Sequence, residues 1–347
     1  MKPSTLKTVL PELIAMRRPP FIWGKSGIGK SSVVRQVAAA MGLQLNDMRL
    51  SQLDSIDLRG FPVPDMKKRR MDWLPCPDLP TNDDPPGMLF LDECNGAMPT
   101  VASAAYQLIL DGRIGQYILP QHWSIVAAGN NMGDRGITHQ MPAPLNNRFI
   151  HIDMEVDHDD WHHQAAADGI SVEIRAYMRL KKESLHDFDP VLNPRSFPTP
   201  RAWYFVDEVF KRENLKNKPL ALLELIKGTV GEGHGASFTG FCRDLASMPD
   251  IDSIMMNPKQ AKLPGNQSVM HAVGTALADR TTPTNFDRVM VYMERLEPEI
   301  QTVFVRSAIN KDDRVCNTKT YQDWILKNQS FLQSGCSKTD GPRKKHV

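Results

Sequence analysis

The chain has 347 residues, with 42 Lys and Arg against 40 Asp and Glu, and 41% of its residues are hydrophobic. This composition is close to the average for globular proteins, and it excludes a disordered, collagen-like or disulfide-scaffold chain. A net charge of +2 gives no field over the whole molecule that would capture nucleic acid or a membrane, so any such binding must be local.

The length suggests two or three domains, and the sequence pattern changes near the middle of the chain. Strand-like runs alternate with helical stretches in the first half, whereas helical spacing of apolar residues dominates the second. We predict an α/β domain over residues 1–156, with a parallel sheet flanked by helices. An all-helical lid domain over 157–256, a helical C-terminal extension over 269–332 and a disordered basic tail over 333–347 would follow.

The location of the protein is predicted from what the sequence lacks. No apolar run approaches the roughly 20 residues that span a bilayer, and the N-terminus has no secretory signal pattern. The five cysteines have no C-x-x-C spacing, which indicates reduced thiols and no zinc site. We therefore expect a cytoplasmic protein with no membrane contact.

Five strands are expected in the first domain, because short runs of strand-forming residues recur there between helical stretches. Three of the runs are continuously apolar, as expected for strands covered on both faces. The predicted strands are residues 21–23, 44–50, 88–91, 124–128 and 149–154.

The first strand leads into a phosphate-binding loop. Residues 24–31 read GKSGIGKS and fit G-x-x-x-x-G-K-[ST], and a helical run over 32–41 closed by Gly42 follows. Backbone N–H groups of such a loop point at phosphate oxygens, Lys30 adds a charge at the β- and γ-phosphates, and Ser31 would hold Mg²⁺. A chance glycine-rich turn is disfavoured by the strand–loop–helix context. The predicted nucleotide-binding residues are Gly24, Gly27, Ile28, Gly29, Lys30, Ser31 and Ser32.

The strand at 88–91 ends in two carboxylates, Asp92 and Glu93. This is the Walker B arrangement, in which Asp92 would hold Mg²⁺ and Glu93 would polarise the attacking water. Two separate carboxylates at fixed positions indicate hydrolysis of the bound nucleotide. A strand that simply ends in a polar turn is the alternative.

Two further candidates follow later strands. Asn130 comes after the run 124–128, where its amide could orient the lytic water. Arg148 precedes the last strand and fits an arginine finger that reaches the γ-phosphate of a neighbouring subunit, with Arg135 as a weaker candidate. A plain turn at Asn130 and a surface salt bridge at Arg148 are the structural alternatives.

Arg201 is predicted in the first turn of a helix over 200–211, since Thr199 and Pro200 form an N-cap and first-turn pair. A cation there opposes the helix dipole, whereas a bound phosphate would be favoured by both the dipole and the guanidinium. We assign Arg201 to the nucleotide of its own subunit, against the alternative of an exposed, tolerated arginine.

The order of these motifs resembles the AAA+ ATPases and, more narrowly, the MoxR family. The narrower resemblance rests on DLRGFP at 57–62, WLP at 73–75, DGRIG at 111–115 and NRF at 147–149, and it covers roughly residues 21–209. It implies a magnesium-dependent ATPase that assembles as a hexameric ring with ATP between subunits. The family's nucleotide-site roles would fall on Lys30, Ser31, Asp92, Glu93, Asn130, Arg148 and Arg201.

The resemblance also implies a function. MoxR proteins are chaperone-like remodellers of protein clients, often beside a partner with a von Willebrand factor A domain, and this is our leading interpretation. A nucleic-acid motor or loader is the alternative, because the basic run at 67–70 would form a collar in a ring. A third reading is a binding module whose assembly is gated by ATP. A metalloprotease site at His158 and His162 and a second phosphate loop at 231–235 are disfavoured; we read 231–235 as a flexible link between helices.

Overall fold

The computed structural model describes residues 1–131, 139, 141–192, 194–245 and 248–336. Its contacts divide the chain into two compact units. Unit 1 comprises Met1–Asp160 and His186–Ala202, and unit 2 comprises Trp161–Leu185 and the chain from Trp203 onward. The four-part division stays a prediction, and the return of residues 186–202 to unit 1 has no counterpart in it.

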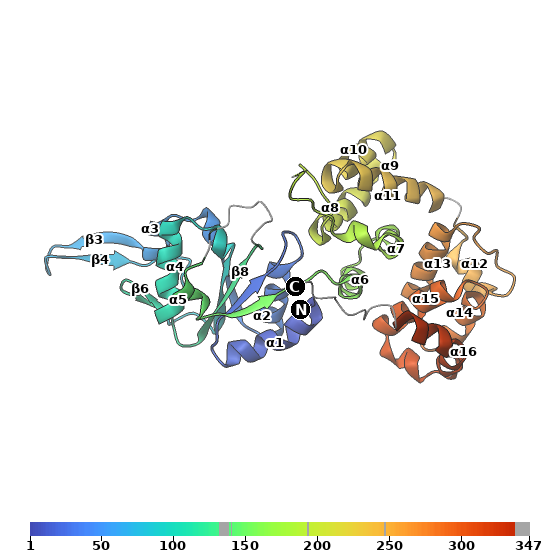
Figure 1. The fold of residues 1–347 in the computed structure, drawn as a ribbon, viewed down its shortest axis with the longest axis horizontal. Helices are drawn as coiled ribbons and strands as arrows, with labels where there is room; N and C mark the ends of the chain where they lie inside the picture. The colour runs from blue at the N-terminus through green and yellow to red at the C-terminus, as the bar shows by residue number, and fades with distance from the viewer. Residues whose placement is uncertain (132–138, 140, 193, 246–247, 337–347) are drawn as a thin grey trace, which may run out of the picture. The chain divides into compact units, whose positions relative to one another are not determined.

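Unit 1 is built on a five-stranded parallel sheet (Figure 1). The strand order in this sheet is β2-β5-β8-β1-β9. All five predicted strands are present, so the predicted α/β fold with a parallel sheet is confirmed. Their bounds are β1 (Pro20–Trp23), β2 (Gln44–Arg49), β5 (Gly87–Asp92), β8 (Trp123–Gly129) and β9 (Ile150–Asp153).

Helices cover both faces of the sheet because alternate strand residues point to opposite sides. Met88 and Phe90 pack with α1 (Pro3–Ala15) and α2 (Lys30–Met41) on one face. Leu89 and Leu91 pack with α3 (Ser55–Arg59) and α4 (Pro99–Asp111) on the other. Every residue of β5 is therefore buried, which fixes the position of the residues that follow it.

Unit 1 also carries two antiparallel hairpins and short helical turns. The hairpin of β3 (Phe61–Asp65) and β4 (Arg70–Leu74) extends away from the rest of this unit (Figure 1). Pro62 and Pro64 leave the edge of β3 poor in N–H donors, which discourages pairing with another strand. The second hairpin joins β6 (Arg113–Ile114) and β7 (Tyr117–Ile118). The remaining elements are η1 (Leu50–Gln52), η2 (Cys94–Gly96) and α5 (Ala143–Asn146).

The chain after the sheet is helical, as predicted. Tyr177, Trp203 and Phe238 form an aromatic core of unit 2 with ring centroids 5.3–5.7 Å apart. A second apolar core joins the helices after residue 250. The elements are α6 (His158–Ala167), α7 (Val172–Leu180), η3 (Lys182–Leu185), α8 (Pro200–Phe210), α9 (Glu213–Lys216), α10 (Pro219–Val230), α11 (Glu232–Asp244), α12 (Ile251–Met256), α13 (Gln267–Arg280), α14 (Phe286–Met293), α15 (Pro298–Lys311), η5 (Asp313–Asn317) and α16 (Lys319–Cys336).

Two expectations about this region are wrong in part. Residues 333–336 were expected in the disordered tail but extend α16, while residues 337–347 lie outside the described part of the chain. The predicted flexible link at 231–235 is reduced to one residue: Gly231 has a φ of 89° between two helices, and α11 begins at Glu232. A glycine-rich segment can continue a helix when neighbouring helices pack against it, and a Cβ at Gly235 would meet the backbone of Lys227 at 2.8 Å.

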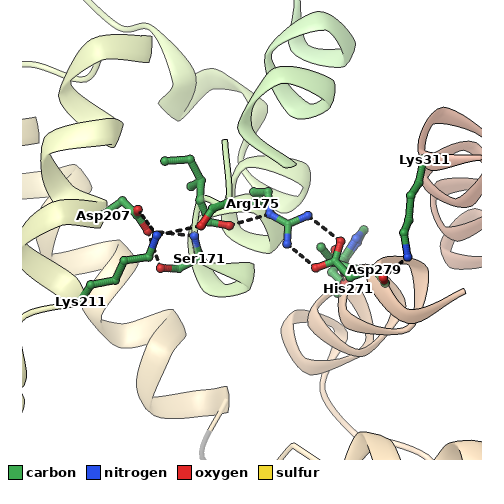
Figure 2. A network of polar contacts seen from close by, with 10 residues as sticks. Ser171, Arg175, Asp207, Lys211, His271, Asp279 and Lys311 are labelled. Atoms are coloured by element: carbon green, nitrogen blue, oxygen red, sulfur yellow. Dashed lines mark hydrogen bonds and ion pairs between the residues drawn. The ribbon is translucent and has the colours of Figure 1, made fainter. Parts of the chain in front are cut away.

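A polar network ties the helices of unit 2 together (Figure 2). Arg175 of α7 is buried and donates to both carboxylate oxygens of Asp279 on α13, with Nη1 2.8 Å from Oδ1. Its Nε also donates to the carbonyl of Ile170 at 2.9 Å. On α8, buried Asp207 accepts from the N–H of Ser171 at 2.8 Å and pairs with Lys211 at 2.6 Å. These bonds join α7 to both α8 and α13.

Across the residues that the structure describes, no helix is both long and apolar enough to cross a membrane.

Candidate active site

The phosphate loop joins β1 to α2, and each of its glycines is required by its backbone conformation, by a close approach of other atoms, or by both. Gly27 and Gly29 have φ values of 75° and 100°, which residues with a Cβ rarely adopt. A Cβ on Gly24 would lie 2.5 Å from Ile28 and 2.9 Å from the carbonyl of Met154. Ile28 itself is buried in the apolar core and anchors the loop. The loop therefore has a defined shape at the N-terminus of α2.

Lys30 begins α2 and is only 8% exposed. Its ammonium donates to the carbonyls of Gly24 at 2.7 Å and Lys25 at 3.0 Å, and to the Oδ1 of Asn130 at 2.9 Å. A buried ammonium needs such acceptors to offset its lost hydration. Asn130 follows β8, so these bonds bring the loop and the end of another strand together.

Ser31 and Asp92 meet directly at this edge of the sheet. The Ser31 hydroxyl donates to Asp92 Oδ2 at 2.6 Å, and Asp92 is 8% exposed. A hydroxyl and a carboxylate are oxygen ligands that Mg²⁺ accepts, and Mg²⁺ sites often use one or two protein oxygens with phosphates and water. The pair therefore fits a magnesium site. Ser32, the next residue of α2, is exposed, and its hydroxyl accepts from the amide of Gln36 at 3.3 Å.

Glu93 lies one residue beyond β5 in a left-handed backbone conformation, with φ of 52°. This conformation is uncommon for a residue with a Cβ and often marks functional sites. The Ser51 hydroxyl, from the turn η1 after β2, donates to Glu93 Oε2. Because β2 and β5 are neighbours, Ser51 can hold the carboxylate of Glu93 at the end of the sheet.

Asn130 lies between the phosphate loop and the two carboxylates, because β8 is flanked by β1 and β5 in the sheet. Asn95, in the turn after Glu93, contacts the peptide groups of Asn130. The sheet order thus brings together Lys30 with Asn130 and Ser31 with Asp92, and Glu93 is adjacent to Asp92.

The two arginines lie at different places in unit 1. Arg148 is exposed between α5 and β9; its N–H donates to the carbonyl of Leu145 at 2.9 Å, and its side chain makes no hydrogen bond or ion pair with the described residues. Arg201 is also exposed, and its N–H donates to the carbonyl of Gly27 at 3.2 Å. The start of α8 therefore lies against the phosphate loop. Arg135 lies outside the described residues.

Thr199 forms the predicted N-cap of α8, because its hydroxyl accepts from the N–H of Ala202 at 3.0 Å. It also packs against the loop, where a Cβ on Gly27 would lie 2.8 Å from the Thr199 side chain. The helix start predicted from sequence is thus a direct neighbour of the phosphate loop.

Burial shapes the electrostatics around the site. On β2, burial and then the nearby charge of Asp92 raise the pKa of Asp47. Burial raises the pKa of Cys94 to about 12, so its thiol next to Glu93 stays protonated at neutral pH. Among the described residues, no group of three or more His, Cys, Asp or Glu side chains could hold a metal ion. His162, one of the two histidines of the disfavoured metalloprotease reading, is buried within unit 2.

The sequence did not reveal three contacts that support the site. These are the contacts of Ser51 with Glu93, of Asn95 with Asn130, and of Thr199, which was predicted only as an N-cap, with the phosphate loop. Each of these three is a common polar residue, and each acts through a neighbour that is distant in sequence. Asn95 carried one available signal, since it lies only three positions after Asp92 in the turn that ends the Walker B strand.

Comparisons with known proteins do not assign a family. No family model matches the chain, and a search of curated proteins finds no match. The chain is similar in structure to the Thermotoga maritima RuvB Holliday junction branch migration motor, with 14% identity, a TM-score of 0.37, and coverage of 86% of this chain and 89% of that one. A point mutant of T. maritima RuvB gives 13% identity, a TM-score of 0.38, and coverage of 86% and 91%.

A Cytophaga hutchinsonii protein described as an ATPase is also similar, with 12% identity, a TM-score of 0.34, and coverage of 96% of this chain and 90% of that one. Values this low carry no conclusion about activity.

Proposed function

We propose that this chain is an AAA+ ATPase that hydrolyses ATP to ADP and phosphate. One observation carries the proposal: at one edge of the sheet Lys30 bonds to Asn130 and Ser31 bonds to Asp92, with Glu93 following Asp92. A phosphate loop alone would fit many nucleotide-binding proteins. The paired carboxylates and the amide beside it favour hydrolysis of the bound nucleotide.

The substrate would bind along the loop from Gly24 to Ser32. The N–H groups at the start of α2 attract phosphate oxygens, and Lys30 would exchange one of its present acceptors for a phosphate oxygen. Ser31 and Asp92 would hold Mg²⁺, which neutralises charge on the phosphates when it is bound. Arg201 would add a positive charge from the start of α8.

Glu93 would act as the general base for the attacking water, and Asn130 would orient that water. Arg148 would serve the active site of a neighbouring subunit, which requires an oligomer. Its exposure, and the lack of a hydrogen bond or ion pair from its side chain to the described residues, are compatible with a finger that reaches another chain.

We infer the biological role from the sequence resemblance to MoxR proteins. The chain would form a hexameric ring and would remodel a protein client beside a partner with a von Willebrand factor A domain. The hairpins at β3–β4 and β6–β7 support the resemblance, since both lie where the MoxR-like sequence motifs fall.

A nucleic-acid motor or loader is the second candidate, and the tip of the β3–β4 hairpin is the observation that favours it. Lys67 and Arg69 are exposed there, whereas Lys68 pairs with Asp65 at 3.2 Å and Arg70 with Asp72 at 3.0 Å. The two acidic partners reduce the local charge. DNA-stimulated ATPase activity that falls with added salt would favour this candidate over the remodeller.

The proposed hydrolysis is tested by the Glu93→Gln variant. We expect it to bind ATP with unchanged affinity and to turn over about 10²–10⁴-fold more slowly, because the general base is lost while the phosphate site is intact. Phosphate release and binding of a fluorescent ATP analogue measure the two quantities. Wild-type protein without ATPase activity under any oligomerising condition, or a fully active Glu93→Gln variant, would refute the proposal.

A further inference from the structure

Asn95 is a buried side chain that the proposed mechanism does not use directly. It lies in the turn η2 after Glu93 and is 4% exposed. Its own carbonyl accepts from the N–H of His139 at 2.7 Å. A buried amide side chain requires hydrogen-bond partners for its donor and its acceptor.

Both partners of the Asn95 side chain belong to one residue, Asn130. Asn95 Nδ2 donates to the carbonyl of Asn130 at 2.8 Å, and the N–H of Asn130 donates to Asn95 Oδ1 at 3.1 Å. This two-point contact resembles the pairing of a neighbouring strand. The pairing of β5 with β8 ends at Leu91 and Ala127, so the Asn95 amide continues the hydrogen bonding between these two segments beyond the sheet.

The adjacent Gly129 is adapted to this contact. A Cβ at that position would lie 2.4 Å from Asn95 Oδ1 and 2.8 Å from the ring of Phe21. Only glycine allows the amide to approach the backbone so closely. Asn95 and Gly129 together therefore hold the main chain in place at the end of β8.

Fixing the peptide of Asn130 restricts its side chain. With the N–H and carbonyl both held, only the side-chain torsions of Asn130 remain free, and its Oδ1 lies 2.9 Å from Lys30 Nζ. We propose that Asn95 is a positioning residue that aims the Asn130 amide at the γ-phosphate and the lytic water. The inference rests on the proposed ATPase function and assigns Asn95 no direct contact with substrate.

The test is a double-mutant cycle of Asn95→Ala and Asn130→Ala, with kcat, KM for ATP and the Kd for ADP measured for each protein. We expect Asn95→Ala to lower kcat about 10- to 100-fold, because a small misplacement of a catalytic group has effects of that size. KM and the ADP Kd should change less than about twofold, since the phosphate loop is untouched. In the Asn130→Ala background, adding Asn95→Ala should have almost no further effect.

Asn95→Asp provides a second variant, in which the new side chain has nearly the same shape as the native asparagine. One carboxylate oxygen can still accept from the N–H of Asn130, but the other faces the Asn130 carbonyl and cannot donate to it. It should therefore also lower kcat, again only when Asn130 is present. Persistence of its effect in the Asn130→Ala background would mean that charge near Asp92 is the cause, and would count against the proposal.

Asn46→Ala is the matched control, because Asn46 also donates from its amide to a backbone carbonyl, that of Asp78 at 3.0 Å. It should leave kcat unchanged. Equal losses from Asn95→Ala with and without Asn130, or a parallel loss of ADP binding, would overturn the positioning role. Failure of the ATPase proposal is distinguishable, since the wild-type protein would then hydrolyse no ATP.

Discussion

At the scale of single residues, the site depends on polar side chains that hold other side chains in place. Lys30 is held by three acceptors, Glu93 by the Ser51 hydroxyl and Asn130 by Asn95. All of these bonds are at least partly buried. A buried polar group that loses its partner costs more free energy than an exposed one, so substitutions here should have measurable effects.

Ser51→Ala removes the hydroxyl that holds Glu93. A hydrogen bond to a charged group contributes about 1.5–3 kcal/mol, so we expect kcat to fall roughly 10-fold or more while ATP binding is kept. Steady-state phosphate release measures this change. Ser103→Ala is the control, because Ser103 donates to a helix carbonyl at 2.8 Å away from the site. An unchanged kcat in Ser51→Ala would show that Glu93 needs no such support.

At the scale of elements, α7 is fastened to α13 by a paired arginine. Arg175 is 7% exposed, whereas the side chain of Asp279 is 34% exposed, so the pair is only partly shielded from water. The same helix is joined to α8 through Ser171 and Asp207. The helices before and after residue 250 therefore belong to one unit, as the contacts divide the chain.

Arg175→Met should lower the free energy of unfolding by about 2 kcal/mol, because it leaves Asp279 without its partner in a partly buried place. The double variant Arg175→Met with Asp279→Leu should recover part of that loss, since two apolar residues need no pairing. Urea unfolding followed by circular dichroism measures both. Arg314→Met, which breaks an exposed ion pair with Asp312, should leave the midpoint almost unchanged. No recovery in the double variant would contradict this account.

The buried histidine of α13 predicts a pH dependence. Burial lowers the pKa of His271; Arg179 and Lys182 act in the same direction, and Glu299 opposes them. The unfolded chain therefore binds a proton at a higher pH than the folded chain does. Stability from this group is fully present above the unfolded pKa of about 6.5 and is lost as the pH falls below it.

We expect the urea midpoint of the wild-type protein to fall between about pH 7.5 and about pH 5.5, and His271→Gln to show a shallower fall. The comparison concerns the slopes with pH, since the substitution can also change the stability at every pH by a constant amount. Equal slopes for the two proteins would exclude His271 as a source of the pH dependence.

At the scale of the whole molecule, the proposed catalysis needs a second copy of the chain. Lys30→Met and Arg148→Ala should each abolish most ATPase activity when tested alone. Mixed in equal amounts, they should recover activity, because roughly one quarter of random interfaces would pair an intact Lys30 with an intact Arg148. Arg18→Ala, another exposed arginine of unit 1, is the control for loss of surface charge.

The expected recovery distinguishes a shared site from two other arrangements. If Arg148→Ala alone is fully active, no finger acts at this position. If the mixture gives only the average of the two separate activities, each chain hydrolyses ATP without its neighbour. Analytical ultracentrifugation of the same samples shows whether the variants still assemble.

Local chemistry let the sequence predict much of the fold and the site. The phosphate loop, the apolar strand β5 with its two carboxylates and the Thr199–Pro200 helix start are each encoded within about ten residues. The helix α1 was not among the predicted elements, although Leu6, Leu10, Leu13 and Ile14 form its buried stripe. The prediction failed where the secondary structure of a segment depends on what packs against it, as in residues 231–235.

By itself, then, the sequence determined which residues are candidates for binding phosphate, metal and water, because those candidate roles follow from residue type and short spacing. Only the tertiary structure decided which polar residues hold them. Ser51 reaches Glu93, Asn95 reaches Asn130, and Arg175 reaches Asp279 across 42, 35 and 104 positions of chain. Sheet order and helix packing create these contacts, and neither follows from the local pattern of any one segment.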